Sequence, residues 1–293
     1  MPVETIINEQ SASFDERPNL PDETLAESGF YWRERDGVKV LVCRPLEAAG
    51  FVNGFSTRLG GVSPFPENDL NLAGFDDDTD ENIYENRRRF LAAIGGDFRL
   101  ATAWQVHGDV VKKVASIEDA KRSNEHADAL VSDLPGILVG VKTADCVPVL
   151  IADPATRSFA SVHAGWRGTV QSIVAKAITA MSQSYGSDPA NLVCAIGPAA
   201  GCERYEVGRD VTDAFAATFA ESDHYFTPTR DGHALIDLHL ANRRQLLSAG
   251  VPDANLFAAP FCTMDHTNLF FSYRIEKKRF GKTGRLLSVI GRP

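Results

Sequence analysis

The sequence contains no long hydrophobic run. Its apolar stretches, such as residues 137–141, are far shorter than the roughly 20 residues that a helix needs to cross a membrane. The first ten residues, MPVETIINEQ, have neither the basic start nor the apolar centre of a secretory signal. We therefore expect a cytoplasmic protein with no membrane partner.

Cysteine is scarce and scattered. The chain has 5 cysteines, an odd number, and no C-x-x-C pair. A secreted domain that depends on disulfides would show an even number at regular spacing. We expect free thiols, one of them a candidate for chemistry.

Positive charge is in the minority. The 30 Lys and Arg residues stand against 39 Asp and Glu residues, which gives a formal net charge of -9. Such a balance predicts no general attraction to nucleic acid or to an anionic membrane, so an anionic substrate would require a local basic pocket. The sequence also gives no indication of an obligate protein partner.

The signatures of several enzyme classes are missing. There is no H-E-x-x-H, no G-x-S-x-G and no G-x-G-x-x-G after a strand, which argues against zincin proteases, ordinary α/β-hydrolases and Rossmann dehydrogenases. The H-x-E and P-C-x-x-C pattern of the zinc base deaminases is also absent.

What the sequence does contain is an alternation of strand and helix patterns in a composition ordinary for a globular protein, 44% hydrophobic and 24% charged. Strands are predicted at residues 38–42, 51–57, 137–141, 147–152, 159–163, 192–196, 269–272 and 286–290. Helices are predicted at residues 83–94, 170–181, 207–219 and 238–247. We expect the three central strands to be adjacent. The turns that join them are too short for a crossover helix, so we predict a single-domain, mixed α/β sandwich.

The N-terminal region differs from the rest of the chain. Residues 1–28 are acidic and polar and show neither helical nor strand periodicity. We interpret them as a mobile extension. Residues 29–293 are then expected to form the catalytic domain.

Three segments combine a histidine or cysteine with small, turn-forming neighbours: 104–108, 143–148 and 163–168. Each lies at a predicted strand end, where His107, Cys146 and His163 have the opportunity to meet. Two imidazoles and a thiolate leave one corner of a tetrahedral zinc open, as a catalytic site requires. Taken singly, a histidine is more often a surface or satisfied core residue, and a free cysteine a small buried one.

A basic residue follows the third of these segments. Arg167 lies at the start of a predicted helix, where its charge opposes the helix dipole, so a bound anion would explain its position. The ordinary alternative is a solvated cation.

A series of short strings resembles the YfiH-like family, also called laccase-domain or polyphenol-oxidase proteins and purine nucleoside phosphorylases. The strings are Phe55-Ser56-Thr57-Arg58, Asn71-Leu72, Gln105-Val106-His107-Gly108, Ala127-Asp128-Ala129-Leu130, Thr143-Ala144-Asp145-Cys146, His163-Ala164-Gly165-Trp166-Arg167-Gly168 and Phe270-Phe271-Ser272-Tyr273-Arg274. The resemblance runs from about Tyr31 to near the C-terminus and implies an α/β/β/α layered sandwich. It also implies a zinc, with copper as an alternative, held by His107, Cys146 and His163. The implied substrates are purine nucleosides: adenosine, inosine and methylthioadenosine split by phosphate, and adenosine deaminated.

Roles for further residues follow from that chemistry. Phosphorolysis holds a phosphate dianion beside the sugar while positive charge develops on the sugar, so it requires cations and hydrogen-bond donors. The candidate substrate- and phosphate-binding residues are Arg58, Arg167, Asn71, Tyr273 and Arg274. Asp145 is a candidate to orient a ligand or to carry a proton, or else it caps a turn.

Three other functions stay open at this point. Cys146 as nucleophile and His163 as base would make a thiol hydrolase, which a tightly bound zinc would rule out. Two histidines and a cysteine also bind blue copper, but the 7 histidines of the chain include no H-x-H pair, which disfavours a multicopper oxidase. The third is a peptidoglycan-editing factor that acts on cell-wall precursors.

Overall fold

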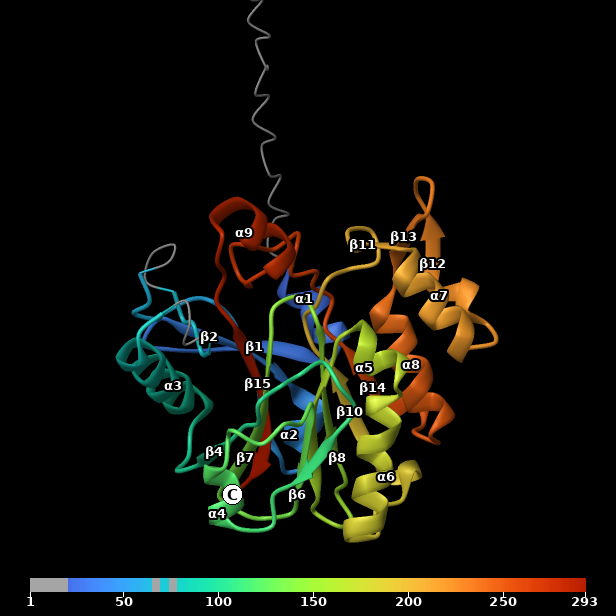
Figure 1. The fold of residues 1–293 in the computed structure, drawn as a ribbon. Coiled ribbons are helices and arrows are strands. Elements are labelled where there is room, and N and C mark those ends of the chain that lie inside the picture. The colour runs from blue at the N-terminus through green and yellow to red at the C-terminus, as the bar shows by residue number, and fades with distance from the viewer. Residues whose placement is uncertain (1–20, 65–68, 74–77) are drawn as a thin grey trace, which may run out of the picture.

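The central strands are buried on both faces. Every residue of β8 (Val147–Ala152) and β9 (Phe159–Ala164) is buried, which explains their continuous apolar sequences. The fold is taken from a computed structural model that describes residues 21–64, 69–73 and 78–293 (Figure 1).

The strands form two six-stranded sheets and a smaller one. The first sheet has the order β1 (Phe30–Arg35), β2 (Val38–Cys43), β3 (Val52–Ser56), β15 (Leu286–Arg292), β7 (Ile137–Thr143) and β4 (Arg99–Ala101). The second has the order β14 (Leu256–Ala258), β10 (Val193–Ile196), β8, β9, β6 (Ala129–Ser132) and β5 (Val111–Lys113). A three-stranded sheet contains β11 (Glu206–Gly208), β13 (His233–Ile236) and β12 (Phe226–Pro228). Parallel and antiparallel neighbours occur in both large sheets, so both are mixed.

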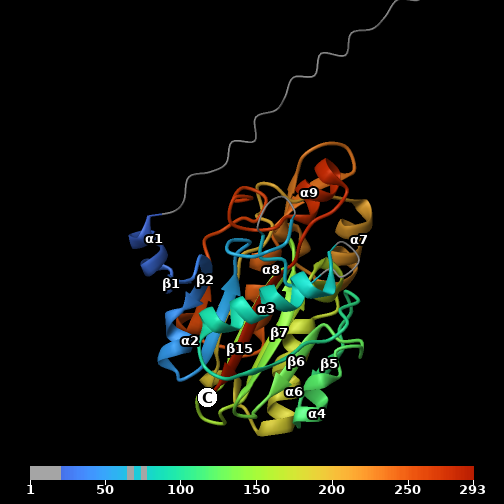
Figure 2. The same cartoon turned by 90° about the vertical axis from the view of Figure 1, so that its left-hand side faces the viewer.

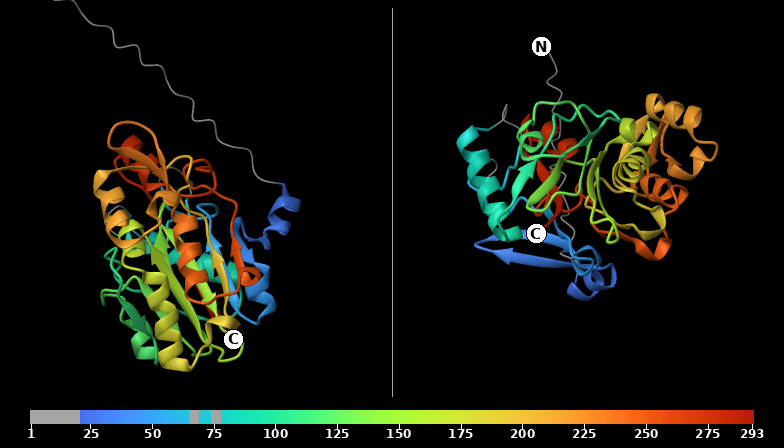
Figure 3. Two further views of the ribbon diagram at one scale, coloured as in Figure 1. Left: turned by 90° about the vertical axis from the view of Figure 1, so that its right-hand side faces the viewer. Right: turned by 90° about the horizontal axis from the view of Figure 1, so that it is seen from below.

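The two large sheets pack face to face, and helices cover their outer faces. The core between them contains Leu41, Phe55 and Val139 from the first sheet and Leu130, Leu150 and Phe159 from the second. Helix α3 (Asp80–Ile94) packs on the outside of the first sheet (Figure 2). Helices α6 (Ile173–Tyr185) and α8 (Leu238–Ser248) cover the second (Figure 3). The expected α/β/β/α sandwich is confirmed.

The remaining helices are short and connect these layers. They are α1 (Asp22–Glu27), α2 (Arg44–Ala48), α4 (Ile117–Lys121), α5 (Trp166–Val170), α7 (Arg209–Thr218) and α9 (Tyr273–Phe280), with 3₁₀ turns η1 (Pro189–Asn191), η2 (Ser222–Tyr225) and η3 (Asp253–Asn255). In the described part of the chain, no helix combines the length and the apolar character that a membrane span requires.

The predicted end of the N-terminal extension, residue 28, lies beyond the start of the fold that the structure describes. Residues 1–20 lie outside the described part of the chain, but residues 22–27 form α1. Leu25 of this helix is 1% exposed and belongs to the core between the sheets. A single buried leucine gives no periodicity, which is why the sequence pattern does not reveal this helix.

Several predicted elements differ in their bounds. Residues 137–141 do not pair with the other two central strands, because β7 belongs to the first sheet and β8 and β9 to the second. The helix expected at 170–181 is divided by Ser172, whose φ of 60° is left-handed, into α5 and α6.

The strand expected at 269–272 is absent. Leu269, Phe270 and Phe271 are buried in the core, but Ser272 caps α9 by accepting a hydrogen bond from the Ile275 amide. These apolar residues fill space as a loop. Their burial does not depend on a strand partner, so the apolar run by itself was a misleading signal.

Candidate active site

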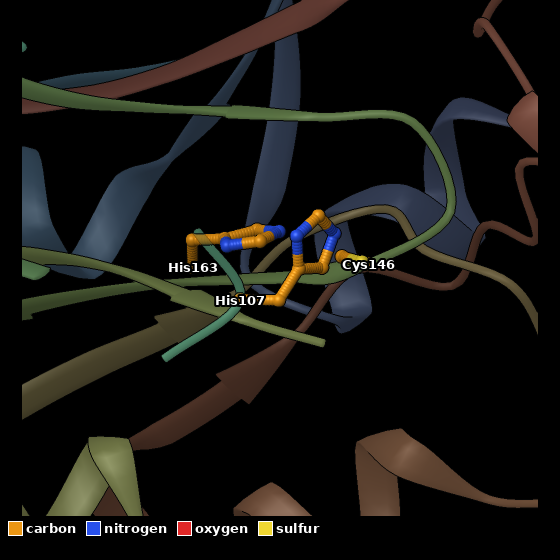
Figure 4. Close-up of side chains that lie close together, drawn as sticks. All are labelled: His107, Cys146 and His163. Atoms are coloured by element: carbon orange, nitrogen blue, oxygen red, sulfur yellow. The ribbon is translucent and has the colours of Figure 1, made fainter. Parts of the chain in front are cut away.

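Three side chains from separate segments converge at the ends of the sheets (Figure 4). His163 lies on β9, Cys146 lies immediately before β8, and His107 lies in the loop between β4 and β5. Their potential ligand atoms all lie within 4.8 Å of one another. The two imidazole rings meet edge to face, with centroids 4.9 Å apart. The predicted meeting of these three residues is therefore present in the fold.

The backbone around the three ligands is unusual. His107 and Asp145 have φ angles of 59° and 85°, in the left-handed region that most residues avoid. Gly165, the residue before α5, has an ordinary φ of -72°. A glycine is therefore not required here by the backbone conformation, but by the space that a side chain would occupy. A Cβ atom at this position would lie 3.0 Å from the Cys146 sulfur and 3.2 Å from His107 Cδ2. The glycine thus leaves room for the thiol and the imidazole.

A fully buried carboxylate, Asp128, aligns both histidines. Its Oδ1 lies 2.7 Å from Nδ1 of His163. Its oxygens also accept hydrogen bonds from the backbone amides of Val106, His107 and Gly108 at 2.8 to 3.2 Å. Because an ionised carboxylate only accepts, Nδ1 of His163 carries a proton, so Nε2 is the ring nitrogen through which His163 could bind a metal. Burial by itself would raise the pKa of Asp128, but the hydrogen bonds from His163 and the amides outweigh it and keep that pKa low.

The charge states of the ligands favour a thiolate. Burial opposes ionisation of Cys146, yet the charge and hydrogen bonds of His163 and His107 lower its pKa to about 6. For His163, burial would lower the pKa, but Cys146 and Asp128 raise it to about 9. A thiolate beside an imidazolium is therefore the form expected at neutral pH without a metal.

This donor set fits a metal ion. Soft thiolate and imidazole donors are the ligands of zinc and of copper, and a ligating histidine ordinarily donates its other ring N–H to a carboxylate, as His163 does to Asp128. His107, Cys146 and His163 could hold a metal through three protein ligands. His107 is exposed, which leaves one side of the group accessible from solvent.

The three ligands line a cleft with a volume of about 1090 Å³. Its walls carry the aromatic residues Tyr84, Trp104, Trp166, Tyr205 and Tyr273 and the cations Arg87, Lys142, Arg167, Arg274 and Arg285. Among the residues that the structure describes, two acidic ones line it, Asp80 and Asp145. In a chain with a net charge of -9, this is the local basic pocket that an anionic substrate requires.

Four of the other candidate residues line the same cleft: Asp145, Arg167, Tyr273 and Arg274. Asp145 accepts hydrogen bonds from the Thr263 hydroxyl and from the Arg274 amide, both at 2.7 Å. It therefore fastens the first turn of α9, which carries Tyr273 and Arg274, beside Cys146. Burial raises the pKa of Asp145, and these hydrogen bonds lower it by less.

Two candidate residues lie elsewhere. The guanidinium of Arg58 is buried and forms ion pairs of 2.7 Å with both Asp69 and Glu276. Asn71 is also buried, and its side-chain oxygen accepts the amide of Arg285 at 2.8 Å. Among the described residues, neither contributes to the wall of the cleft. Their side chains hold loops together, and we do not retain them as binding residues.

The sequence interpretation missed Asp128, Lys142 and Arg285. Asp128 lies in the string Ala127 to Leu130, which belongs to the family resemblance, but the sequence alone gives it no role. The available signal was a single aspartate among apolar residues at a strand end. A carboxylate in such a place is buried only when hydrogen-bond or ion-pair partners compensate its charge. Nothing in the local sequence distinguishes Lys142 or Arg285 from surface cations.

Comparisons with known proteins agree with this geometry. A family model described as multi-copper polyphenol oxidoreductase laccase matches residues 52–293. Purine nucleoside phosphorylase YfiH from Escherichia coli is 34% identical over 254 residues, which cover 86% of this chain and 98% of that protein. A purine nucleoside phosphorylase from Deinococcus radiodurans is 39% identical over 243 residues, covering 82% and 88% of the two chains. The crystal structure of YlmD from Geobacillus stearothermophilus has a TM-score of 0.81 at 34% identity, covering 90% of this chain and 98% of that one.

The chain belongs to the YfiH-like purine nucleoside phosphorylase family. The residues that match the family model include His107, Cys146 and His163 and every described residue that lines the cleft. The YfiH-like part of the chain therefore contains the whole candidate active site.

Proposed function

We propose that the protein is a zinc-dependent purine nucleoside enzyme. It splits adenosine, inosine and methylthioadenosine with phosphate and also deaminates adenosine. The observation that carries the proposal is the convergence of His107, Cys146 and His163 in a cleft whose walls are aromatic and basic. The names of the relatives, purine nucleoside phosphorylases at 34% and 39% identity, give it further support.

The three ligands and Asp128 prepare the metal site. His107, Cys146 and His163 would hold the zinc, which would supply a Lewis acid beside the bound substrate. Asp128 keeps the proton of His163 on Nδ1 and fixes the loop that carries His107. The site is thereby ordered before the substrate arrives, which reduces the cost of assembling it.

Phosphorolysis breaks the bond between the sugar C1′ and the purine nitrogen and forms a bond from C1′ to a phosphate oxygen. The leaving base takes up a proton, and positive charge develops on the sugar in between. Arg167 is our candidate for one contact to the phosphate. Its guanidinium lies 4.3 Å from the ring centroid of Trp166, and no carboxylate in the described residues pairs with it. An unpaired guanidinium offers two parallel N–H donors to a phosphate dianion.

The aromatic side chains suit the purine. Trp104 is 60% exposed and Tyr273 is 48% exposed, although both are large aromatic residues. Both line the cleft. Stacking a base on an aromatic ring contributes about 1–3 kcal/mol and tolerates different bases. This tolerance accords with a substrate range that includes adenosine and inosine.

Asp145 acts in this scheme as a positioning residue. Its two hydrogen bonds to Thr263 and to the Arg274 amide leave its carboxylate engaged. The Arg274 guanidinium in turn lies 4.9 Å from the ring centroid of Tyr205. The carboxylate thus places the wall formed by Tyr273 and Arg274 at a fixed distance from the metal ligands.

The test is a product analysis with zinc-quantified protein. Adenosine is incubated with and without phosphate, and the products are identified by chromatography. Free adenine together with ribose 1-phosphate, formed only with phosphate, is expected for phosphorolysis, and inosine is expected for deamination. If neither product forms, the nucleoside proposal is wrong.

A thiol hydrolase is the second candidate, and the Cys146–His163 pair favours it. The thiolate and imidazolium forms expected without metal are those of a nucleophile with its base. Metal content separates the two functions. A stoichiometric zinc that cannot be removed without loss of activity would leave no thiolate free to attack, whereas full activity of the zinc-free protein would establish the hydrolase.

A further inference from the structure

A second group of cations lines the cleft on the side that faces α3. Lys142 is on β7, where the register pairs it with Leu287 of β15. Leu287 packs in the outer core beneath α3, so the Lys142 side chain leaves the sheet on that face. Arg285 lies two residues before Leu287 and therefore on the same face. Arg87, from α3, lines the same part of the cleft.

The backbone ties these cations together. Leu72 accepts a hydrogen bond from Nε of Arg87 at 2.9 Å, and its amide donates to the Arg285 carbonyl at 3.0 Å. Gln105 brackets the backbone of Lys142, accepting its amide and donating to its carbonyl, both at 2.7 Å. Lys142 thus extends from a fixed position on β7, and Arg285 from the residue immediately before β15.

The charges of Lys142 and Arg285 are not neutralised within the described part of the chain. No carboxylate there forms an ion pair with either residue. The Arg285 guanidinium lies 5.6 Å from the ring centroid of Tyr273 and donates to two backbone carbonyls. Burial and the charge of Arg87 outweigh the opposing charge of Asp128 and lower the pKa of Lys142 to about 8. Burial of these charges and the repulsion between them are unfavourable. An anion that binds between the cations offsets both effects.

We propose that Lys142 and Arg285, with Arg87 beside them, form an anion subsite that binds a phosphoryl group. The choice of ligand rests on the proposed function, because a phosphoryl group reaches a nucleoside enzyme in two ways. It is either inorganic phosphate, the co-substrate, or the phosphate ester of a nucleotide. Both sources present the same dianionic oxygens to the same three cations.

Direct binding tests the subsite separately from catalysis. Inorganic phosphate, adenosine and AMP are titrated by calorimetry into the wild-type protein and into Lys142→Met and Arg285→Gln. All titrations are repeated with metal-free protein, so that binding to the metal itself is not counted. Lys39→Met is the matched control, because Lys39 is a half-buried lysine on β2 of the same sheet and does not line the cleft.

The expected result is a loss of at least about tenfold in phosphoryl affinity in Lys142→Met, with adenosine affinity changed less than about twofold. If phosphate itself is the ligand, its own affinity falls. If an ester is the ligand, wild-type protein binds AMP more tightly than adenosine and the variant loses this preference. Arg285→Gln should act in the same direction.

The subsite is overturned if phosphate and AMP bind both variants as tightly as they bind Lys39→Met. The proposed function fails in a different way. Wild-type protein that binds phosphate through Lys142, but releases no adenine from adenosine, would support the subsite and remove phosphorolysis.

Discussion

Nδ1 of His163 lies 2.7 Å from Oδ1 of Asp128, a carboxylate with no exposed surface. The same carboxylate accepts the amide of His107 at 3.0 Å. Two candidate metal ligands that are distant in the sequence are thus aligned by one residue that does not itself belong to the candidate ligand set. The precision of the site depends on this carboxylate as much as on the three ligands.

Asp128→Asn should weaken zinc binding about 10- to 100-fold, since the amide no longer stabilises the His163 tautomer as the carboxylate does. Zinc affinity is measured by competition with a chromophoric chelator. Asp109→Asn is the matched control, because Asp109 pairs with Lys176 on the surface. Equal zinc affinities of the two variants would contradict the role given to Asp128.

Gly165→Ala should reduce zinc occupancy without unfolding the protein. The φ of -72° permits alanine, but the new methyl group would press on the Cys146 sulfur at 3.0 Å. Gly201→Ala makes a similar contact, 3.2 Å from the Cys262 sulfur, which is not a ligand. Metal content and melting temperature are compared for the two variants. We expect lost zinc only in Gly165→Ala, and normal occupancy there would show that the space is not needed.

Removal of the metal should abolish phosphorolysis and expose Cys146 to alkylation. Iodoacetamide labelling followed by peptide mass spectrometry, with and without a chelator, measures this. Cys202 is exposed and should react in both samples, whereas the buried Cys43 and Cys194 should react in neither. Labelling of Cys146 that does not depend on the chelator would mean that the thiol does not bind the metal.

Arg58→Met should destabilise the protein by about 3–5 kcal/mol, because it leaves the buried carboxylates of Asp69 and Glu276 without their cation. Chemical denaturation measures the free energy of unfolding. Arg88→Met, which removes an exposed ion pair with Glu85, should change it little. A stable Arg58→Met protein with impaired phosphate binding would instead return Arg58 to the list of substrate residues.

Phosphoryl binding through Lys142 should weaken as the pH rises through about 8, the value to which burial and Arg87 lower the pKa of this lysine. Only the protonated amine attracts the anion. The charged groups that act on this lysine are Arg87, which lowers its pKa, and Asp128, which raises it by less. Lys142→Arg should move the loss of affinity above pH 10. Calorimetry at pH 7 to 10 gives the profile, and identical profiles for the two proteins would refute the assignment.

The sequence predicted the meeting of the three candidate ligands better than it predicted their surroundings. His107, Cys146 and His163 each lie in a local string of turn-forming residues at a strand end, which is visible in one dimension. Asp128 acts through a hydrogen bond between neighbouring strands, because β6 pairs with β9. Arg58 was expected in the phosphate site for its residue type, but its partner Glu276 comes from α9, far along the chain.

The sequence by itself determined where the central strands and the longer helices form and which three residues meet, because periodicity records burial and short strings record turns. The tertiary structure alone decided which cations face the cleft and which are neutralised in buried ion pairs. The physical reason is that a charged side chain acquires its role from the groups packed against it. Those groups come from strands and helices that are brought together only when the two sheets close on their common core.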